Sequence, residues 1–321
     1  MNTKEMLLWR MRSQGIAEGR WRTMESLVGG MGCIQAQDFG QAKWAIGVRV
    51  AVTGVEGMRG AAAPDGTVTR GPAGVTEADV DAAFNEGRLL RTHVLRPTWH
   101  FVLPADIGWM LRLTGPKVKT FCLPYHRKLG IDVGVLKRSK KIMIRAMEGG
   151  KQLTRTELAA LFRAAKIDTG DIRMNFLLMD AELDGLICSG GRRRKQFCYA
   201  LLEERAPRQT DLDGEAALAE LTRRYFVSRG PATAADLAWW GGMTLGQARR
   251  GLEIVGAELE RVTVGGEAYW WDGGAALKEV KGVAGGREVL LLPAFDEYAV
   301  AYKDRGEIVP PAYVKKSSYG L

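Results

Sequence analysis

Apolar residues recur at helical intervals in three segments near the start of the chain, within 4–14, 20–28 and 39–50. This spacing predicts three amphipathic helices. The following segment, 54–74, is rich in Gly, Ala and Pro, which is typical of a long loop. The first part of the chain is therefore predicted to be helical, with its polar chemistry confined to the connections between helices.

A repeat follows this helical region. Thr76, Thr154 and Thr233 each precede an apolar helical pattern and have an acidic residue three positions later, and successive threonines lie 78 and 79 residues apart. A Thr with an acid at this spacing is the capping-box arrangement, in which each side chain accepts a hydrogen bond from the backbone of the other residue. Three such boxes at nearly equal intervals predict three related modules.

Each box leads through one or two predicted helices into two strand-like runs joined by a short turn. The first pair of strands is predicted at 89–95 and 98–103 with a turn at Arg96-Pro97, the second at 185–189 and 195–200 with a turn at Gly190-Gly191, and the third at 259–264 and 267–271 with a turn at Gly265-Gly266. Helices followed by a β-hairpin are typical of the winged helix, a DNA-binding shape. We therefore expect an α+β, mostly helical chain of three tandem winged-helix modules, bounded at 1–116, 117–207 and 208–321.

Composition narrows the class of partner. The 321 residues include 46 Lys and Arg against 37 Asp and Glu, which gives a net charge of +9 and favours a polyanionic partner. The four cysteines are scattered without a C-x-x-C pair, so neither a zinc site nor a disulfide framework is indicated, and no cofactor is implied. No apolar run reaches the length of a membrane-spanning helix. We expect a cytoplasmic protein without a membrane partner.

Positive charge is concentrated on two of the three predicted hairpins. The third carries mainly acidic side chains and is expected to be structural. Basic residues at a hairpin tip commonly contact phosphates, although a solvated turn is the ordinary alternative. The segment 117–145 is also basic and could line the same DNA-binding surface. The candidate DNA contacts are Arg91, His93 and Arg96 in the first hairpin and Arg192, Arg193, Arg194 and Lys195 in the second.

A short polar stretch, Gln35-Ala36-Gln37-Asp38, interrupts the apolar pattern between the second and third predicted helices. Read from the pair alone, Gln35 and Gln37 are most simply two polar residues that close a helix. Asp38 is expected to cap the next helix, or else to stabilise a nearby cation. His100 is expected either to be structural or to contact DNA. A carboxamide can hold a water but is no general base near neutral pH.

We assign two further features to the fold. The apolar positions of Trp99, Trp239 and Trp240 predict core side chains. The pair Asp296-Glu297 follows an apolar run at 290–292 that predicts a buried strand. We expect this acidic pair to support the fold or the groups around the reaction centre and not to perform the chemistry.

Several segments together resemble the bacterial AlkZ/YcaQ family of winged-helix DNA glycosylases. The resemblance covers nearly the whole chain. It rests on Gln35–Asp38, Arg96–His100, Ala181–Ile187, Gly230–Thr233, Asp236–Gly242 and Leu291–Tyr298. Family members usually continue past the segment that matches Tyr319-Gly320-Leu321, so we expect the third module to be incompletely closed.

The resemblance implies a C-shaped, monomeric, monofunctional glycosylase that excises alkylated purines from double-stranded DNA and can unhook interstrand crosslinks. It implies a role in DNA repair or self-resistance at the bacterial nucleoid. The family's Gln-apolar-Gln motif, typical of the AlkZ branch, carries over onto Gln35 and Gln37 as catalytic residues. Because glutamine cannot act as a base, such a site suits a purine alkylated at N7 or N3, which already carries a positive charge and departs as a neutral base.

The residues also allow a second class of function. Winged helices also occur in transcriptional regulators, and a fold does not determine a function. A regulator reading a palindrome is expected to present an exposed basic recognition helix. The predicted helices at 172–183 and 245–255 are poor in Arg and Asn that could read bases, which favours the glycosylase over a DNA-binding protein without chemistry.

Overall fold

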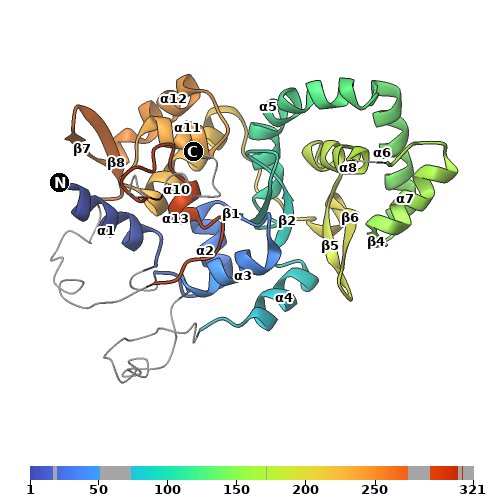
Figure 1. Cartoon of the computed structure of the whole chain (residues 1–321), viewed down its shortest axis with the longest axis horizontal. Coiled ribbons are helices and arrows are strands. Elements are labelled where there is room, and N and C mark those ends of the chain that lie inside the picture. Colours follow the sequence, from blue (N-terminus) through green and yellow to red (C-terminus); the bar gives the residue numbers. More distant parts are fainter. Residues whose placement is uncertain (17–19, 51–73, 171, 274–289, 310–312, 314–321) are drawn as a thin grey trace. The chain divides into compact units, whose positions relative to one another are not determined.

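The computed structural model of the chain describes residues 1–16, 20–50, 74–170, 172–273, 290–309 and 313 (Figure 1). Nearly all of the predicted loop 54–74 lies outside this range. The described chain mixes helices with short antiparallel strands, and helix is the larger part. It divides into two units: unit 1 comprises 1–80, 219–240 and 244–321, and unit 2 comprises 81–218 and 241–243.

Unit 1 begins with helices whose starts are fixed by polar side chains. Asn2 caps the first helix, Thr23 caps the second, and the Asp38 carboxylate accepts from the Gln41 amide at 3.0 Å to cap the third. The predicted cap role of Asp38 is therefore confirmed. The elements are α1 (Thr3–Ser13), α2 (Met24–Met31), β1 (Ile34–Gln35), α3 (Phe39–Gly47), α11 (Ala234–Trp240), α12 (Leu245–Val255), η1 (Gly256–Glu258), β7 (Glu260–Val264), β8 (Glu267–Trp271) and α13 (Glu297–Val300).

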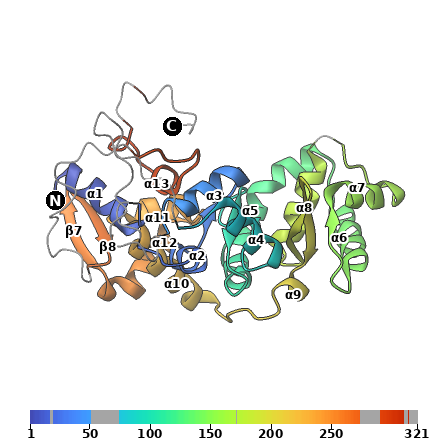
Figure 2. The same ribbon diagram turned by 90° about the horizontal axis from the view of Figure 1, so that it is seen from below.

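Unit 2 contains two hairpins and the longest helix. The strands pair antiparallel, with Thr92 opposite His100 in the first hairpin and Cys188 opposite Ala200 in the second. Helix α6 lies beside α7 and α8 in both ribbon views (Figure 1 and Figure 2). The elements are β2 (Leu90–His93), β3 (Trp99–Val102), α5 (Ile107–Lys128), α6 (Val133–Met147), β4 (Leu153–Thr154), α7 (Arg155–Ala164), α8 (Arg173–Leu183), β5 (Ile187–Arg193), β6 (Gln196–Leu201) and α9 (Leu202–Arg205). Helices α4 (Glu77–Glu86) and α10 (Gly214–Arg229) contain the unit boundaries.

The three predicted capping boxes are confirmed. The Thr154 hydroxyl accepts from the Glu157 amide at 3.2 Å, while the Glu157 carboxylate accepts from the Thr154 amide at 2.7 Å. Thr76 and Thr233 make the same reciprocal pair with an aspartate three residues later. The three hairpins also form where the sequence predicts them, and Gly265-Gly266 adopts positive φ angles of 60° and 87°, as a tight hairpin turn requires.

The predicted position of the turn in the second hairpin is wrong. Gly190-Gly191 lies within β5 at a shift of register, and the chain turns instead at Arg194-Lys195, where Arg194 has a φ of 58°. Close packing explains why glycines occupy these positions. A Cβ on Gly190 would lie 2.6 Å from Oε1 of Gln152, and this oxygen accepts a hydrogen bond from the Gly191 amide. The longer strands extend the basic residues beyond the body of the sheet.

Two core predictions are also wrong. Trp240 is fully buried, but Trp239 is 43% exposed. The predicted buried strand at 290–292 is irregular backbone, and Leu291 is 71% exposed. We predicted that these residues are buried because they are apolar. Solitary exposed apolar residues are, however, common on protein surfaces.

Candidate active site

Gln35 ends β1, and the chain then leaves regular structure until Asp38 caps α3. Ala36 and Gln37 thus connect β1 to α3, while Gln35 itself is the last residue of a strand. Gln35 is buried with 8% of its surface exposed, Ala36 is fully buried, and Gln37 is exposed. The two glutamines therefore lie in different environments, one enclosed by protein and the other open to solvent.

The backbone of Gln35 is held by a buried carboxylate. Its amide donates to Oε1 of Glu297 at 2.9 Å, and Oε2 of Glu297 accepts from Nε1 of Trp240 at 3.0 Å. Arg229 donates to the same Oε2 through Nε at 3.0 Å and through a terminal nitrogen at 2.8 Å. Glu297 and Arg229 are both fully buried. This carboxylate is ion-paired and fully engaged by donors, so its role is to hold the backbone in place.

Arg229 also ties down the segment that precedes the motif. It donates to the carbonyl oxygen of Met31 at 2.7 Å and to that of Cys33 at 2.9 Å, and its guanidinium lies 4.2 Å from the ring of Trp240. One arginine thus joins α10 to the end of α2 and to the start of β1. Such a fixed backbone gives the Gln35 side chain a defined origin.

A second buried ion pair supports the other side of the motif. Arg49 donates to both carboxylate oxygens of Asp296, at 2.8 and 2.6 Å, and to Oε1 of Gln14 at 2.9 Å. Gln14 in turn donates to the hydroxyl of Tyr302. Burial raises the pKa of Tyr302, so its hydroxyl stays protonated and donates to the carbonyl oxygen of Arg229. The two ion pairs therefore form one connected network.

Asp296-Glu297 was expected to support the fold or the reaction centre, and its two carboxylates occupy the centre of this network. The arginines that pair with them, Arg49 and Arg229, were missed. Each follows an apolar helical pattern and is fully buried. An arginine that ends a helix shortly after core residues, as Arg229 ends α10 three residues after Phe226, is the signal that could have revealed them.

The most informative atom of the site is the side-chain carbonyl oxygen of Gln35. Its Oε1 is buried and has no hydrogen-bond partner among the residues that the structure describes. A buried carbonyl oxygen without a donor costs free energy, on the order of 1–3 kcal/mol. Such an atom is suited to accept a hydrogen bond from a water molecule or a ligand.

The remaining candidate residues belong to unit 2. His100 is fully buried, and its Nδ1 lies 2.9 Å from the Thr98 carbonyl oxygen. His93 is buried against the carboxylate of Glu182, and the Arg91 guanidinium lies 4.3 Å from the ring of Trp99. Arg96 is partly exposed. His93 and Arg91 are thus buried and have partners inside unit 2.

The second hairpin presents its cations differently. Arg193, Arg194 and Lys195 are exposed, whereas Arg192 is half-buried and lies 3.4 Å from Asp81. Arg193 forms an ion pair with Glu157 at 2.7 Å. Arg194 and Lys195, at the turn itself, form no ion pair with any described residue. These two cations project at the tip.

The described residues offer neither a metal site nor a membrane span. The four cysteines are buried, and no group of three or more His, Cys, Asp or Glu side chains in the described parts of the chain could hold a metal ion. None of the described helices is both long and apolar enough to span a bilayer. Among the described residues, the Gln35 segment is supported by two buried ion pairs and the hydrogen bonds around them.

Comparisons with known proteins agree with the resemblance seen in the sequence. A family model described as "DNA glycosylase AlkZ-like" matches residues 28–319. Among solved structures, the Streptomyces sahachiroi DNA glycosylase AlkZ is similar with a TM-score of 0.66 at 18% identity, over 85% of this chain and 70% of that one. A comparison with curated protein sequences found no match. The family match spans most of the chain and contains both glutamines. The chain belongs to the AlkZ-like family of DNA glycosylases.

Proposed function

We propose that this chain is a monofunctional DNA glycosylase that hydrolyses the N-glycosidic bond of purines carrying a positive charge from alkylation at N7 or N3. The observation that carries the proposal is the buried Oε1 of Gln35, which has no partner among the described residues while the Gln35 amide is fixed by Glu297. The geometry suits an acceptor that positions a water molecule. It does not suit a general base, because a carboxamide oxygen is too weakly basic to take a proton from water near neutral pH.

In the proposed reaction, Oε1 of Gln35 accepts a hydrogen bond from the attacking water. Gln37 lies two residues later in the motif, where its side chain is exposed to solvent. The water oxygen bonds to C1′ as the bond from C1′ to the base breaks. The bonding electrons neutralise the charged purine, which leaves without being protonated, and the excess proton of the water passes to solvent. Positioning supplies the rate enhancement, and well-oriented reactants can contribute several kcal/mol.

The support for Gln35 also limits what the neighbouring carboxylates do. Asp38 accepts from the Gln41 amide at the start of α3, which makes it a helix cap first. Glu297 and Asp296 are each paired with an arginine. A carboxylate so engaged has little capacity to take a proton from water. It can still contribute negative potential to an oxocarbenium-like sugar.

We propose that DNA is held by three tandem winged-helix modules, at 1–116, 117–207 and 208–321, in a C-shaped arrangement. Each module consists of helices followed by one of the three antiparallel hairpins. Support comes from the three capping boxes at nearly equal spacing and from the family. The basic tip at Arg192–Lys195 is the proposed phosphate contact, together with Arg96. The partner is double-stranded DNA that is alkylated or crosslinked, bound by a monomer at the bacterial nucleoid.

Single-turnover base release tests this proposal. Duplex DNA with one N7-methylguanine is incubated with excess wild-type chain, Gln35→Ala or Gln37→Ala, and free base is measured over time. We expect release by the wild type and at least a hundredfold slower release by Gln35→Ala with DNA affinity retained. Sequence-specific binding of undamaged DNA without base release would instead favour a transcriptional regulator and reject the glycosylase.

A further inference from the structure

Helices α5 and α6 carry an unusual charge distribution. Together they span 37 residues without an aspartate or glutamate. Charge of one sign along two successive helices creates a local field that attracts a polyanion. The cations are Arg112, Lys117, Lys119, Arg127 and Lys128 in α5 and Lys137, Arg138, Lys140, Lys141 and Arg145 in α6.

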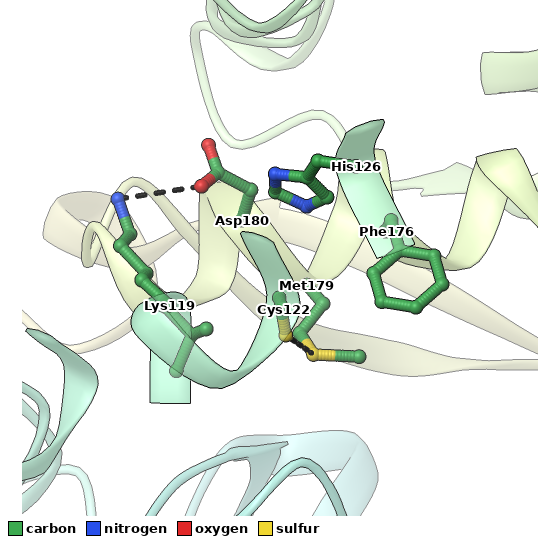
Figure 3. Close-up of a pocket in the computed structure, with 7 residues that line it drawn as sticks. Lys119, Cys122, His126, Phe176, Met179 and Asp180 are labelled. Carbon is green, nitrogen blue, oxygen red and sulfur yellow. Dashed lines mark hydrogen bonds and ion pairs between the residues drawn. The ribbon is translucent and has the colours of Figure 1, made fainter. Parts of the chain in front are cut away.

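Two of these cations are neutralised on the side of α5 that faces α8. Lys119 lies 3.4 Å from Asp180 (Figure 3). Both Lys119 and Lys140 also pair with Asp184. On the same side, Sγ of Cys122 lies 3.7 Å from Sδ of Met179. Lys119, Asp180 and these two sulfur-containing side chains line a small pocket between α5 and α8. Because its charges are paired and its sulfur atoms are packed together, its residues serve the packing of α5 on α8.

A neighbouring face of α5 presents what we call the aromatic stripe, formed by Lys117, Phe121, Tyr125 and Lys128. Spacings of four, four and three residues place side chains on one face of a helix. Phe121 is 57% exposed and Tyr125 43% exposed, and their ring centroids lie 6.1 Å apart. Both lysines are exposed, and neither forms an ion pair with a residue that the structure describes.

The stripe is fixed at one edge by aromatic stacking. The ring of Tyr125 lies parallel to that of Phe176, with centroids 5.3 Å apart and an interplanar angle of 20°. Phe176 is largely buried and meets the ring of His126 edge-on. Tyr125 is therefore oriented by the core of unit 2 while its free surface meets solvent. Two large rings left in water forfeit the stabilisation that burial provides, which calls for a functional explanation.

We propose that the aromatic stripe binds unpaired nucleotides of single-stranded DNA. In a duplex the faces of the bases are covered by their neighbours, whereas an unpaired base can stack on an exposed aromatic ring. Phe121 and Tyr125 offer such rings, and the two lysines flank them over about 16 Å of helix, where they can neutralise phosphates. The absence of acidic side chains from α5 and α6 favours a polyanion over an apolar protein surface.

This inference goes beyond the glycosylase reaction, because it concerns unpaired DNA without a lesion and uses none of the residues around Gln35. It gives the chain a contact for DNA whose strands are separated. Base release and stripe binding are measured separately, so either can fail without the other.

The test is binding of fluorescently labelled oligo(dT) to the full chain, followed by anisotropy at several salt concentrations. Phe121→Ala/Tyr125→Ala is expected to weaken binding at least tenfold, since each stacked base contributes substantially. Phe121→Trp/Tyr125→Trp keeps the rings and is expected to retain affinity, while Phe121→Leu/Tyr125→Leu keeps only apolar surface and is expected to lose it. Val133→Ala, which removes a 66% exposed apolar side chain from α6, is the matched control.

Lys117→Gln/Lys128→Gln should lower the slope of log affinity against log salt by about 1.4, the value for two phosphates of a single strand. Equal affinity for oligo(dT) in the double alanine variant and in Val133→Ala would overturn the proposal. Retained affinity in the leucine variant would overturn it as well, because the surface would then require apolar contact and not stacking. Tenfold tighter binding of oligo(U) than of oligo(dT) would reject DNA as the occupant.

Discussion

The Gln35 segment of unit 1 and the hairpin tip of unit 2 meet opposite physical requirements. Around Gln35, charged side chains are buried and paired, and they fix the backbone through hydrogen bonds of 2.7–2.9 Å. At the tip, Arg194 and Lys195 are exposed and form no ion pair with described residues. A water molecule must be held in one geometry, whereas a phosphate backbone can be attracted by cations that remain mobile. Burial therefore marks the proposed chemistry, and exposure marks the proposed binding.

The largest expected effect comes from breaking the buried anchor. Glu297→Gln leaves Arg229 buried without its ion partner, which typically costs about 3–5 kcal/mol of stability. Displacement of the Gln35 backbone should also slow base release about a hundredfold. Thermal unfolding gives the first quantity and single-turnover release, measured below the unfolding transition, gives the second.

Glu307→Gln is the matched control for this change. Glu307 pairs with Arg10 at 3.4 Å in the same unit but is partly exposed and is not bonded to the Gln35 segment. We expect its base release to stay within a factor of two of the wild type. Normal base release by folded Glu297→Gln would show that the anchor supports the fold but not the reaction.

A smaller effect is expected at the exposed tip. Arg194→Gln/Lys195→Gln should lower the slope of log affinity against log salt by about 1.8 for duplex DNA, since each lost phosphate contact contributes about 0.9. Stability should be unaffected. Arg261→Gln, which removes an exposed cation from β7 of the largely acidic third hairpin, is the control. An unchanged slope in the double variant would remove this tip from the proposed interface.

The smallest expected effect is a dependence of stability on pH in unit 2. Burial lowers the pKa of His126, and Lys119 and Lys140 add to this effect against the opposing attraction of Asp180. The unfolded chain then binds a proton near pH 6.5 more readily than the folded chain does. His126 therefore costs no stability above pH 6.5 and destabilises the fold as pH falls below that value.

Urea unfolding of the wild type and His126→Gln between pH 7.5 and 5 measures this contribution. The difference in stability between the two chains should shift in favour of the variant as the solution is acidified. A constant difference over this range would mean that His126 takes up protons equally in both states.

The parts of the fold set by local chemistry could be predicted from the sequence. Thr154 with Glu157 fixes a helix start within four residues, and Gly265-Gly266 fixes a turn, so these elements form as expected. The turn at Gly190-Gly191 was misplaced because those glycines serve a distant contact with Gln152. The start of α3 just after the motif was predictable for the same local reason, since Asp38 caps that helix.

The support of the site could not be predicted in this way. Glu297 lies 262 residues from Gln35 along the chain, and Arg229 joins it from a third segment. No pattern in the sequence specifies which buried arginine pairs with which carboxylate, because that choice depends on how the helices pack. The sequence likewise shows many basic residues between Lys117 and Arg145. It does not show that Lys119 and Lys140 are neutralised by Asp180 and Asp184.

The central claim is that a carboxamide site acts only on bases that are already good leaving groups. Single-turnover release from two duplexes, identical except for one N7-methylguanine or one neutral hypoxanthine, tests it most directly. The account predicts release of the cationic base and none of the neutral base above background, with the former lost in Gln35→Ala. Comparable release of hypoxanthine would contradict it, because departure of a neutral purine needs a proton donor that this site does not provide.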